Sequence, residues 1–345
     1  MRALPRIVLT FAVSAAGAAG FRAAGLPLPF LLGPMLACLA VALMGVRLAT
    51  WTPLTDTMRT ILGVAVGASF TPAIVGRMGD MVASLALVPL FLLVCGALGY
   101  PYLRRIAGFD APTAFYSAMP GGLQDMLLFG EEAGGDPRAM SLLHATRVLM
   151  IVTILPLALW LYWGIDLSQP PGAGAADLPW QELTVMAVAG ILGWRLARAV
   201  GMFGASILGP MILTAALTLA GVIQHRPPAE AIQAAQFFIG MVVGVKYTGI
   251  TLTEVRRILL VGLGHAAILG AVAAVFAEAA LGFGLAPPLD AILAFAPGGQ
   301  AEMAVIAIVA GADVAYVITH HVLRIVVVIV GAPLVFRWLK VTRPR

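Results

Sequence analysis

The stretch Ala118-Met119-Pro120-Gly121-Gly122 interrupts an otherwise apolar run, and it recurs 177 residues later as Phe295-Ala296-Pro297-Gly298-Gly299. Proline removes a backbone donor and clashes with the preceding helical turn, and glycine permits tight reversals, so a Pro-Gly-Gly run disfavours a continuous helix. Both runs are therefore predicted to be broken near the middle. Two such breaks at one fixed separation also indicate an internal repeat.

Further pairs of uncommon residues show the same separation. They are Gly63 and Gly240, Gly67 and Gly244, Thr71 and Thr248, His144 and His321, Arg147 and Arg324, and Pro156 and Pro333. The motif Leu32-Gly33-Pro34-Met35 recurs as Leu208-Gly209-Pro210-Met211, one residue out of step. The sequence therefore predicts a duplication, with a first membrane repeat at 1–164, an extracytoplasmic linker at 165–180 and a second membrane repeat at 181–345.

The composition is that of a chain solvated by lipid. Of its 345 residues, 61% are hydrophobic and only 11% are charged, against about 25% charged residues in soluble domains. A segment inside lipid must satisfy its own backbone hydrogen bonds, which favours helices of about 20 apolar residues. We therefore expect an all-α polytopic membrane protein of about ten spans. Cys38 and Cys95 lie in apolar stretches and are expected to pack in the core.

Positive charge in the loops orients these segments, because cytoplasmic loops carry the excess of lysine and arginine. The loop at Arg104-Arg105 is basic, whereas the linker at 165–180 carries no basic residue. Both termini are predicted to be cytoplasmic, on the strength of Arg2, Arg6, Arg337, Lys340, Arg343 and Arg345. These assignments conflict if every apolar segment spans the membrane.

The conflict disappears if the two Pro-Gly-Gly segments, 110–131 and 288–311, enter and leave the membrane on the same side. Each repeat then has about five spans plus one re-entrant hairpin, and this odd number of crossings makes the two repeats inverted. The alternative is a kinked helix that spans the membrane fully. Cysteines placed at Gly108 and Ala133 would distinguish the two, because only a hairpin exposes both positions on one side.

Polar side chains at membrane depth form the candidate site, because a charge at the bilayer centre costs about 2.5–3.5 kcal/mol even on permissive scales. At 1.5 Å per residue, Arg147 lies roughly 13 Å from the inner face, and Arg324 lies roughly 15 Å from the outer face. Inverted repeats would place both arginines around one central site. The predicted substrate-binding residues are Pro120, Gly121, Gly122, Gln124, Asp125, His144, Arg147, Pro297, Gly298, Gly299, Gln300, Glu302, His320, His321 and Arg324.

Two interpretations of these residues stay open. In the first, Asp125 pairs with Arg147 and Glu302 pairs with Arg324, so that each repeat holds one structural ion pair. In the second, the broken helices and their free backbone groups form a substrate site, as in secondary transporters with inverted repeats. The histidines would then carry coupling protons, because the unperturbed pKa of histidine is near 6.5.

The remaining motifs are interpreted as structural. The pairs Gly63/Gly67 and Gly240/Gly244 are predicted to allow close helix contact rather than to coordinate an ion. The Leu-Gly-Pro-Met elements are expected to be helix-breaking turns, which either add unwound backbone near the site or kink a packed helix. His225 and His265 are isolated in the sequence, and we expect no functional role for either.

Signatures of enzymes are missing from the sequence. The five histidines include no H-x-x-x-H pair and the two cysteines form no cluster, so no zinc or copper site is predicted. The chain also has no phosphate-binding loop and no nucleophile elbow. We therefore expect no catalytic residues, no metal and no cofactor.

Several of these motifs resemble the AbrB family of bacterial membrane proteins. The residues that carry the resemblance are 28–35, 119–126, 136–138, 141–147, 294–303 and 319–324. The resemblance extends over nearly the whole chain except the first span and the linker, and it implies a duplicated domain in the bacterial inner membrane. It implies little chemistry, because members carry labels such as ammonia monooxygenase or regulator.

The leading hypothesis is a secondary transporter of a small anionic or zwitterionic solute, with its site between the two repeats. Guanidinium groups match carboxylates in bidentate geometry, so two arginines at a central site favour such a solute. The alternatives are a membrane-bound oxidoreductase, following the ammonia monooxygenase label, and a non-transporting regulator or scaffold. The expected partners are a small-molecule or ion substrate, the lipid bilayer and a second copy of the chain in a homodimer, with no nucleic acid.

Overall fold

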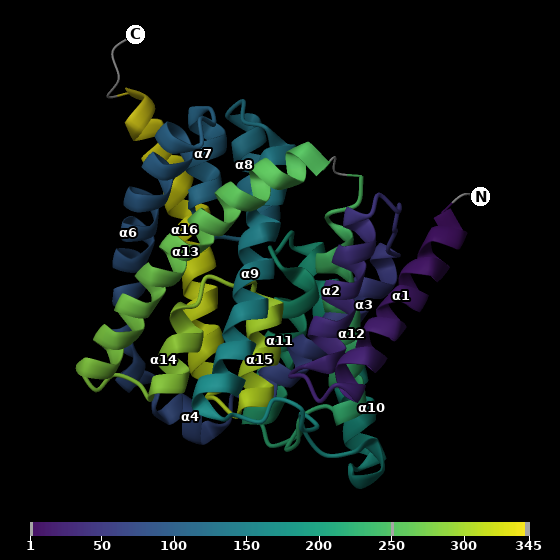
Figure 1. Cartoon of the computed structure of the whole chain (residues 1–345). Coiled ribbons are helices and arrows are strands. Elements are labelled where there is room, and N and C mark those ends of the chain that lie inside the picture. The colour runs from purple at the N-terminus through teal and green to yellow at the C-terminus, as the bar shows by residue number, and fades with distance from the viewer. Residues whose placement is uncertain (1–2, 250–251, 342–345) are drawn as a thin grey trace. The chain divides into compact units, whose positions relative to one another are not determined.

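The structure is a computed structural model that describes residues 3–249 and 252–341 (Figure 1). Within these two ranges every regular element is a helix and no strand occurs, which confirms the predicted all-α class. Arg2, Arg343 and Arg345, on which the orientation of the termini partly rests, lie outside the described residues.

Five of the described helices are long and apolar enough to cross a membrane. They are Leu4–Ala23, Met78–Ile106, Pro137–Trp163, Arg257–Gly282 and Val314–Leu339. Four shorter apolar helices accompany them, at Pro29–Leu43, Ala205–Leu219, Ala229–Val245 and Gln300–Ala310. The chain is therefore a helical membrane protein, whereas the number of about ten spans and the inverted orientation of the repeats remain predictions.

The helices form two compact units, and each unit combines segments from both halves of the sequence. Unit 1 contains Met1–Gly79, Thr153–Ile250 and Ala301–Ala315. Unit 2 contains Asp80–Val152, Thr251–Gln300 and Tyr316–Arg345. The predicted division at 165–180 concerns the duplication of the sequence, and the compact units interleave the two halves instead of following it.

Unit 1 is built from two corresponding sets of three helices. The first set is α1 (Ala3–Ala23), α2 (Pro29–Leu43) and α3 (Thr52–Gly67), and the second is α10 (Trp180–Ala199), α11 (Ala205–Leu219) and α12 (Ala229–Val245). Helix α1 packs against α2, and α10 packs against α11. Each second helix then packs against the third helix of the other set, α2 against α12 and α11 against α3. The two halves of the sequence are therefore intertwined in this unit.

The repeated glycines lie where these exchanged helices touch. A Cβ atom on Gly63 would collide with the carbonyl oxygen of Ile207, and one on Gly240 would collide with that of Leu31. Gly67 and Gly244 lie equally close to the carbonyl oxygens of α11 and α2, one turn further on. The prediction that these glycines allow close helix contact is therefore confirmed.

The Leu-Gly-Pro-Met elements do not break their helices. Pro34 lies inside the continuous helix α2, and Pro210 lies inside α11. The flanking Gly33 is pressed against the backbone of Gly17 on α1, and Gly209 against that of Gly193 on α10. The expectation of helix-breaking turns was wrong, because close packing on two sides holds each helix continuous across its proline.

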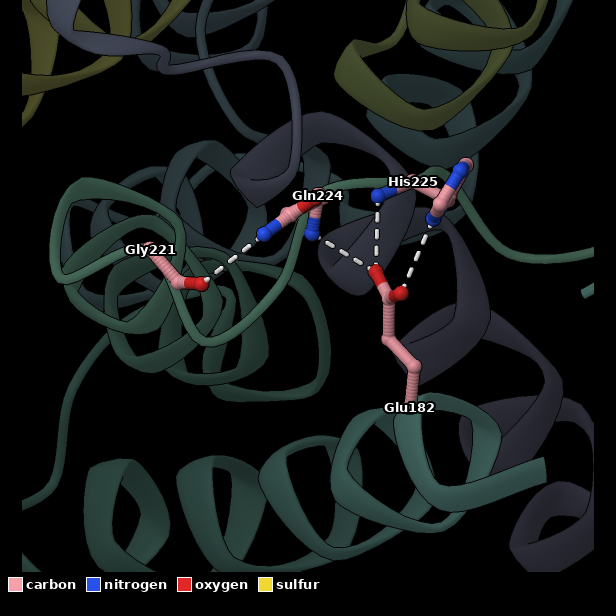
Figure 2. A network of polar contacts seen from close by, with 4 residues as sticks. All are labelled: Glu182, Gly221, Gln224 and His225. Atoms are coloured by element: carbon pink, nitrogen blue, oxygen red, sulfur yellow. Dashed lines mark hydrogen bonds and ion pairs between the residues drawn. The ribbon is translucent and has the colours of Figure 1, made fainter. Parts of the chain in front are cut away.

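Hydrogen bonds of Glu182 connect the start of α10 to the loop that precedes α12 (Figure 2). One carboxylate oxygen of Glu182 accepts the backbone N–H groups of Gln224 and His225 at 2.6 and 2.7 Å. The other lies 2.9 Å from Nδ1 of the His225 ring. His225 is therefore not isolated, since it fixes this loop to the helix.

Unit 2 contains α5 (Val82–Leu85), α6 (Leu87–Pro101), α7 (Ala111–Ala118), α8 (Leu123–Glu132), α13 (Leu252–Gly282) and α14 (Pro288–Phe295). Most of α9 (Pro137–Trp163) and of α16 (Val314–Val341) also belongs to it. Helices α6 and α13 run antiparallel. Their Phe91 and Phe276 rings meet at one end, and the Tyr102 hydroxyl, just after α6, donates to the Val261 carbonyl oxygen at the other.

The first broken segment folds back on itself. The Thr113 hydroxyl donates to the Asp110 carboxylate at 2.6 Å and accepts the backbone N–H of Asp136 at 2.8 Å. Asp110 also caps α7 by accepting the Thr113 N–H at 2.8 Å. The chain before α7 and the chain after α8 therefore meet at one threonine, and this geometry supports a hairpin over 110–131.

Candidate functional site

Both Pro-Gly-Gly stretches interrupt a helix, as predicted. Helix α7 ends at Ala118 and α8 begins at Leu123, with extended backbone at Met119 and Gly122. Helix α14 ends at Phe295 and the next helix, α15 (Gln300–Ala310), begins at Gln300. Each break leaves carbonyl groups without helical partners, because no N–H group of the same helix donates to its last carbonyl oxygens.

One arginine from the following long helix binds each break in the same way. Arg147 of α9 donates from Nη1 to the carbonyl oxygen of Met119 at 3.3 Å. Arg324 of α16 donates from Nη1 to that of Ala296 at 2.8 Å. The two donor–acceptor pairs occupy equivalent positions in the duplicated sequence. A cation at the C-terminal end of a half-helix is stabilised by the partial negative charge of its carbonyls.

Arg324 makes two further hydrogen bonds. A second nitrogen, Nη2, donates to the carbonyl oxygen of Gly298 at 2.8 Å and to Nδ1 of His321 at 3.2 Å. Arg324 is only 3% exposed, and its Nε–H has no hydrogen-bond partner among the described residues. Every group to which it donates is neutral, and it forms no ion pair within residues 3–249 and 252–341, so its buried positive charge has no compensating anion among these residues.

The predicted ion pairs are absent. The Asp125 carboxylate folds back onto Gly122 at the start of its own helix, α8. Among residues 3–249 and 252–341, neither Asp125 nor Glu302 forms an ion pair. The hypothesis of one structural ion pair per repeat was therefore wrong: the Asp125 carboxylate lies against Gly122 of its own helix start, and both arginines donate to backbone carbonyls.

The neighbourhood of Arg324 is positive and rich in donors. Arg147 lies close enough for the two positive charges to repel each other, and the buried thiol of Cys95 lies within the field of both. Gln300, two residues beyond Gly298, has a buried amide nitrogen that lacks a hydrogen-bond acceptor in the described structure. An arrangement with spare donors and excess positive charge can accept an anion.

The hydrogen bonds of His321 fix its protonation. Nδ1 must accept from Arg324, since a guanidinium can only donate. Nε2 then carries the single ring proton and donates to the Leu293 carbonyl oxygen at 2.9 Å. His321 is therefore a neutral residue that positions Arg324, and a second proton on its ring would break the bond to the arginine.

The remaining predicted residues differ in their placement. Pro120, Pro297 and Gly298 are buried, and Gly121 packs against Val328 of α16. Nδ1 of His144 accepts from Nη1 of Arg147 at 3.2 Å, as Nδ1 of His321 accepts from Arg324. Gln124 is exposed, Gly299 is partly buried, and Glu302 is buried in unit 1 rather than in unit 2.

Three functional candidates were not predicted from the sequence. Ser84 of α5 is fully buried and lies 3.0 Å from Nε2 of His320. Cys95 lies near both arginines, and His265 is buried with no hydrogen-bond partner at either ring nitrogen among the described residues. Ser84 is the only residue with a hydroxyl group in the apolar run 82–99. This feature could have marked it in the sequence as a candidate site residue.

An apolar pocket of about 420 Å³ lies beside the first break in unit 2. It is lined by α6, α16 and the side chains of Phe115 and Met119. The carbonyl of the same Met119 accepts from Arg147. The walls of this pocket offer few polar atoms, so it does not recognise an anion by itself.

No group of three or more histidine, cysteine, aspartate or glutamate side chains that could hold a metal ion occurs in the stretches 3–249 and 252–341.

Comparison with known proteins identifies the family of this chain. The family model described as "Transition state regulatory protein AbrB" matches residues 30–340. The protein YhjN of Bacillus subtilis (strain 168) is 28% identical over 303 residues, which cover 81% of this chain and 77% of YhjN. The protein AbrB of Escherichia coli (strain K12), whose name describes it as a regulator, is 25% identical over 334 residues, or 94% of each chain. Since the family model spans most of the sequence, the chain belongs to the AbrB family.

Proposed function

We propose that this protein is a secondary transporter that moves a small anionic or zwitterionic solute across the bacterial inner membrane. The solute would bind at the two helix breaks, between the arginines of the two sequence repeats. The proposal assigns no enzymatic activity to the chain. Discontinuous helices at a central site are the usual construction of transporters built from repeated halves.

The observation that carries the proposal is the state of Arg324. A buried charge without a counter-ion costs several kcal/mol, and the carbonyls of Ala296 and Gly298 offset only part of that cost. A bound carboxylate would supply the missing negative charge. It would also accept from the free Nε–H of Arg324.

The geometry favours a ligand that presents a negatively charged acceptor group, such as a carboxylate, to Arg324. The guanidinium of Arg324 has a fixed orientation, because it donates to two carbonyl oxygens and to His321. Gln300 adds an unused amide donor next to the same break. Charge-assisted hydrogen bonds from a preoriented guanidinium are about twice as strong as neutral ones, so an anion would bind more tightly than its uncharged analogue.

Accumulation of an anion requires a coupling ion. Moving one negative charge into a cell with a negative interior costs about 2.3 kcal/mol per 100 mV. We propose the proton as this ion, since histidine is the side chain whose charge changes near neutral pH.

The test is a melting-temperature screen of purified protein with organic acids and amino acids at two pH values. We expect at least one carboxylate to raise the melting temperature and its uncharged amide to have no effect. That acid should then exchange with its labelled form across proteoliposomes. A screen in which no anion stabilises the protein, together with no exchange, would refute the proposal.

The alternatives give different outcomes in the same preparation. Copper or iron bound in stoichiometric amount to the purified protein would favour the membrane oxidoreductase. The regulator suggested by the name of the Escherichia coli relative would bind an anion without exchanging it across the membrane.

A further inference from the structure

A chain of three hydrogen bonds runs through His320 in unit 2. Nδ1 of His320 lies 2.8 Å from the carbonyl oxygen of Tyr316, one turn earlier on α16. Nε2 lies 3.0 Å from the hydroxyl oxygen of Ser84 on α5. The Ser84 hydroxyl in turn lies 2.9 Å from the carbonyl oxygen of Met81. Both ends of the chain are therefore carbonyl oxygens, which can only accept.

The number of protons in this chain of hydrogen bonds decides how many of its three bonds can form. Three hydrogen bonds need three protons, and each terminal bond must receive its proton from the inner group. A neutral imidazole and a serine hydroxyl together provide only two. With a neutral ring, the hydroxyl can donate either to His320 or to Met81, but not to both. With a doubly protonated ring, Nε2–H donates to Ser84, the hydroxyl donates to Met81, and all three bonds form.

We infer that His320 and Ser84 form a proton-binding site, in which His320 takes up one proton and the Ser84 hydroxyl turns from His320 to Met81. The step forms one N–H bond on the ring and breaks one O–H bond of a hydronium ion, which is left as water. His321 is excluded from this role, because its Nδ1 is occupied by Arg324 and its Nε2 already donates to Leu293. The two adjacent histidines thus have different functions.

The surroundings of His320 set the balance between its two states. Burial opposes the charged ring, which is 1% exposed. The two carbonyl acceptors and the Tyr316 ring, at 4.2 Å between centroids, favour the charged ring. Phe295 of α14 closes a further side at 5.8 Å. The titratable or charged groups that face it are the Tyr316 hydroxyphenyl and the neutral His321 on α16, with Arg324 one turn further along that helix.

This position couples the proton to the anion. His320 and Arg324 are four residues apart, so they lie on one helix face with a rise of about 6 Å between them. Their positive charges repel each other, and an anion on Arg324 would remove that repulsion. Each ligand would then strengthen the binding of the other by the same factor. This coupling rests on the proposed anion site, whereas the proton site itself does not.

The proton site is tested by a pH titration of ¹⁵N-histidine NMR signals, using the full chain in lipid nanodiscs. We expect the His320 signal, identified by its absence in His320→Gln, to show a doubly protonated ring while the protein stays folded. In Ser84→Ala the midpoint should move to lower pH, because the charged ring loses an acceptor. The matched control is His225→Gln, which removes an exposed histidine and should leave the titration of the His320 signal unchanged. A His320 that stays singly protonated until the protein unfolds would overturn the inference.

The coupling is tested with succinate as the probe anion, in melting-temperature shifts at acidic and alkaline pH. We expect the apparent affinity to rise about tenfold toward acidic pH in the wild type and to be independent of pH in His320→Gln. A pH dependence that is unchanged in His320→Gln would place the coupling proton elsewhere. If succinate fails to bind at any pH while the NMR titration succeeds, the proton site stands and the choice of solute is wrong.

Discussion

Arg324 donates to the carbonyl oxygen of Ala296, and the two atoms are 2.8 Å apart across 28 residues of sequence. Arg147 makes the same hydrogen bond to Met119, also across 28 residues. The duplication therefore preserves a specific contact between a buried arginine and a helix break. Neither hydrogen bond involves a carboxylate, and Arg324 forms no ion pair among the described residues, which leaves its positive charge for a ligand.

Substitution of Arg324 by lysine should separate ligand binding from folding. A single ammonium cannot reach both Ala296 and Gly298 in the planar geometry of the guanidinium. We expect the protein to fold, with a loss of about 1.5–3 kcal/mol in its free energy of unfolding, because one charge-assisted hydrogen bond is missing. The apparent affinity for a carboxylate should fall at least tenfold. Melting curves with and without the acid measure both effects. An Arg324→Lys protein that binds the acid as the wild type does would show that Arg324 only caps the break.

Alanine at Gly63 should destabilise unit 1. The new methyl group would be forced onto the carbonyl of Ile207 in α11, and overpacking of this kind costs about 1–3 kcal/mol. Gly20 in α1 is the matched control, because nothing lies near its Cβ position. Gly20→Ala should be neutral or stabilising by up to about 1 kcal/mol, since alanine favours helix. Equal melting temperatures for both variants would contradict the close packing of α3 and α11.

The hairpin over 110–131 should expose both of its ends on one side of the membrane. Gly108 has a φ of +76°, so a cysteine there would be strained. The exposed Ile106 and Glu132 are better positions for labelling. In a chain that lacks Cys38 and Cys95, single cysteines at these two positions should react with an impermeant maleimide from the same side. Reaction from opposite sides would instead support a kinked helix that spans fully.

Removal of the Glu182 carboxylate should loosen the loop before α12. Glu182→Ala leaves the N–H groups of Gln224 and His225 without their acceptor (Figure 2). We expect a loss of about 1–3 kcal/mol and faster hydrogen exchange confined to this loop. Thr184→Ala is a control on the same helix, because its hydroxyl bonds only to its own helix backbone. Exchange that is unchanged in Glu182→Ala would show that the carboxylate does not hold the loop.

The sequence by itself determined the class, the duplication and the position of both helix breaks. Composition requires burial in lipid, and lipid requires helices, because no water is available there for unpaired backbone groups. Pro-Gly-Gly opposes a helix through its own backbone chemistry, so its effect needs no distant contact. The same local rule failed at Pro34 and Pro210, where packing of Gly33 and Gly209 against neighbouring helices keeps α2 and α11 continuous.

Only the tertiary structure decided which partner each polar residue takes. Opposite charges in the sequence predicted ion pairs of Asp125 with Arg147 and of Glu302 with Arg324, but both arginines donate to backbone carbonyls at the helix breaks. The adjacent His320 and His321 are indistinguishable in sequence. They differ in function because one meets Ser84, which lies 236 residues away, and the other meets Arg324, three residues away on the same helix. Contacts between distant segments depend on packing, and no local pattern records them.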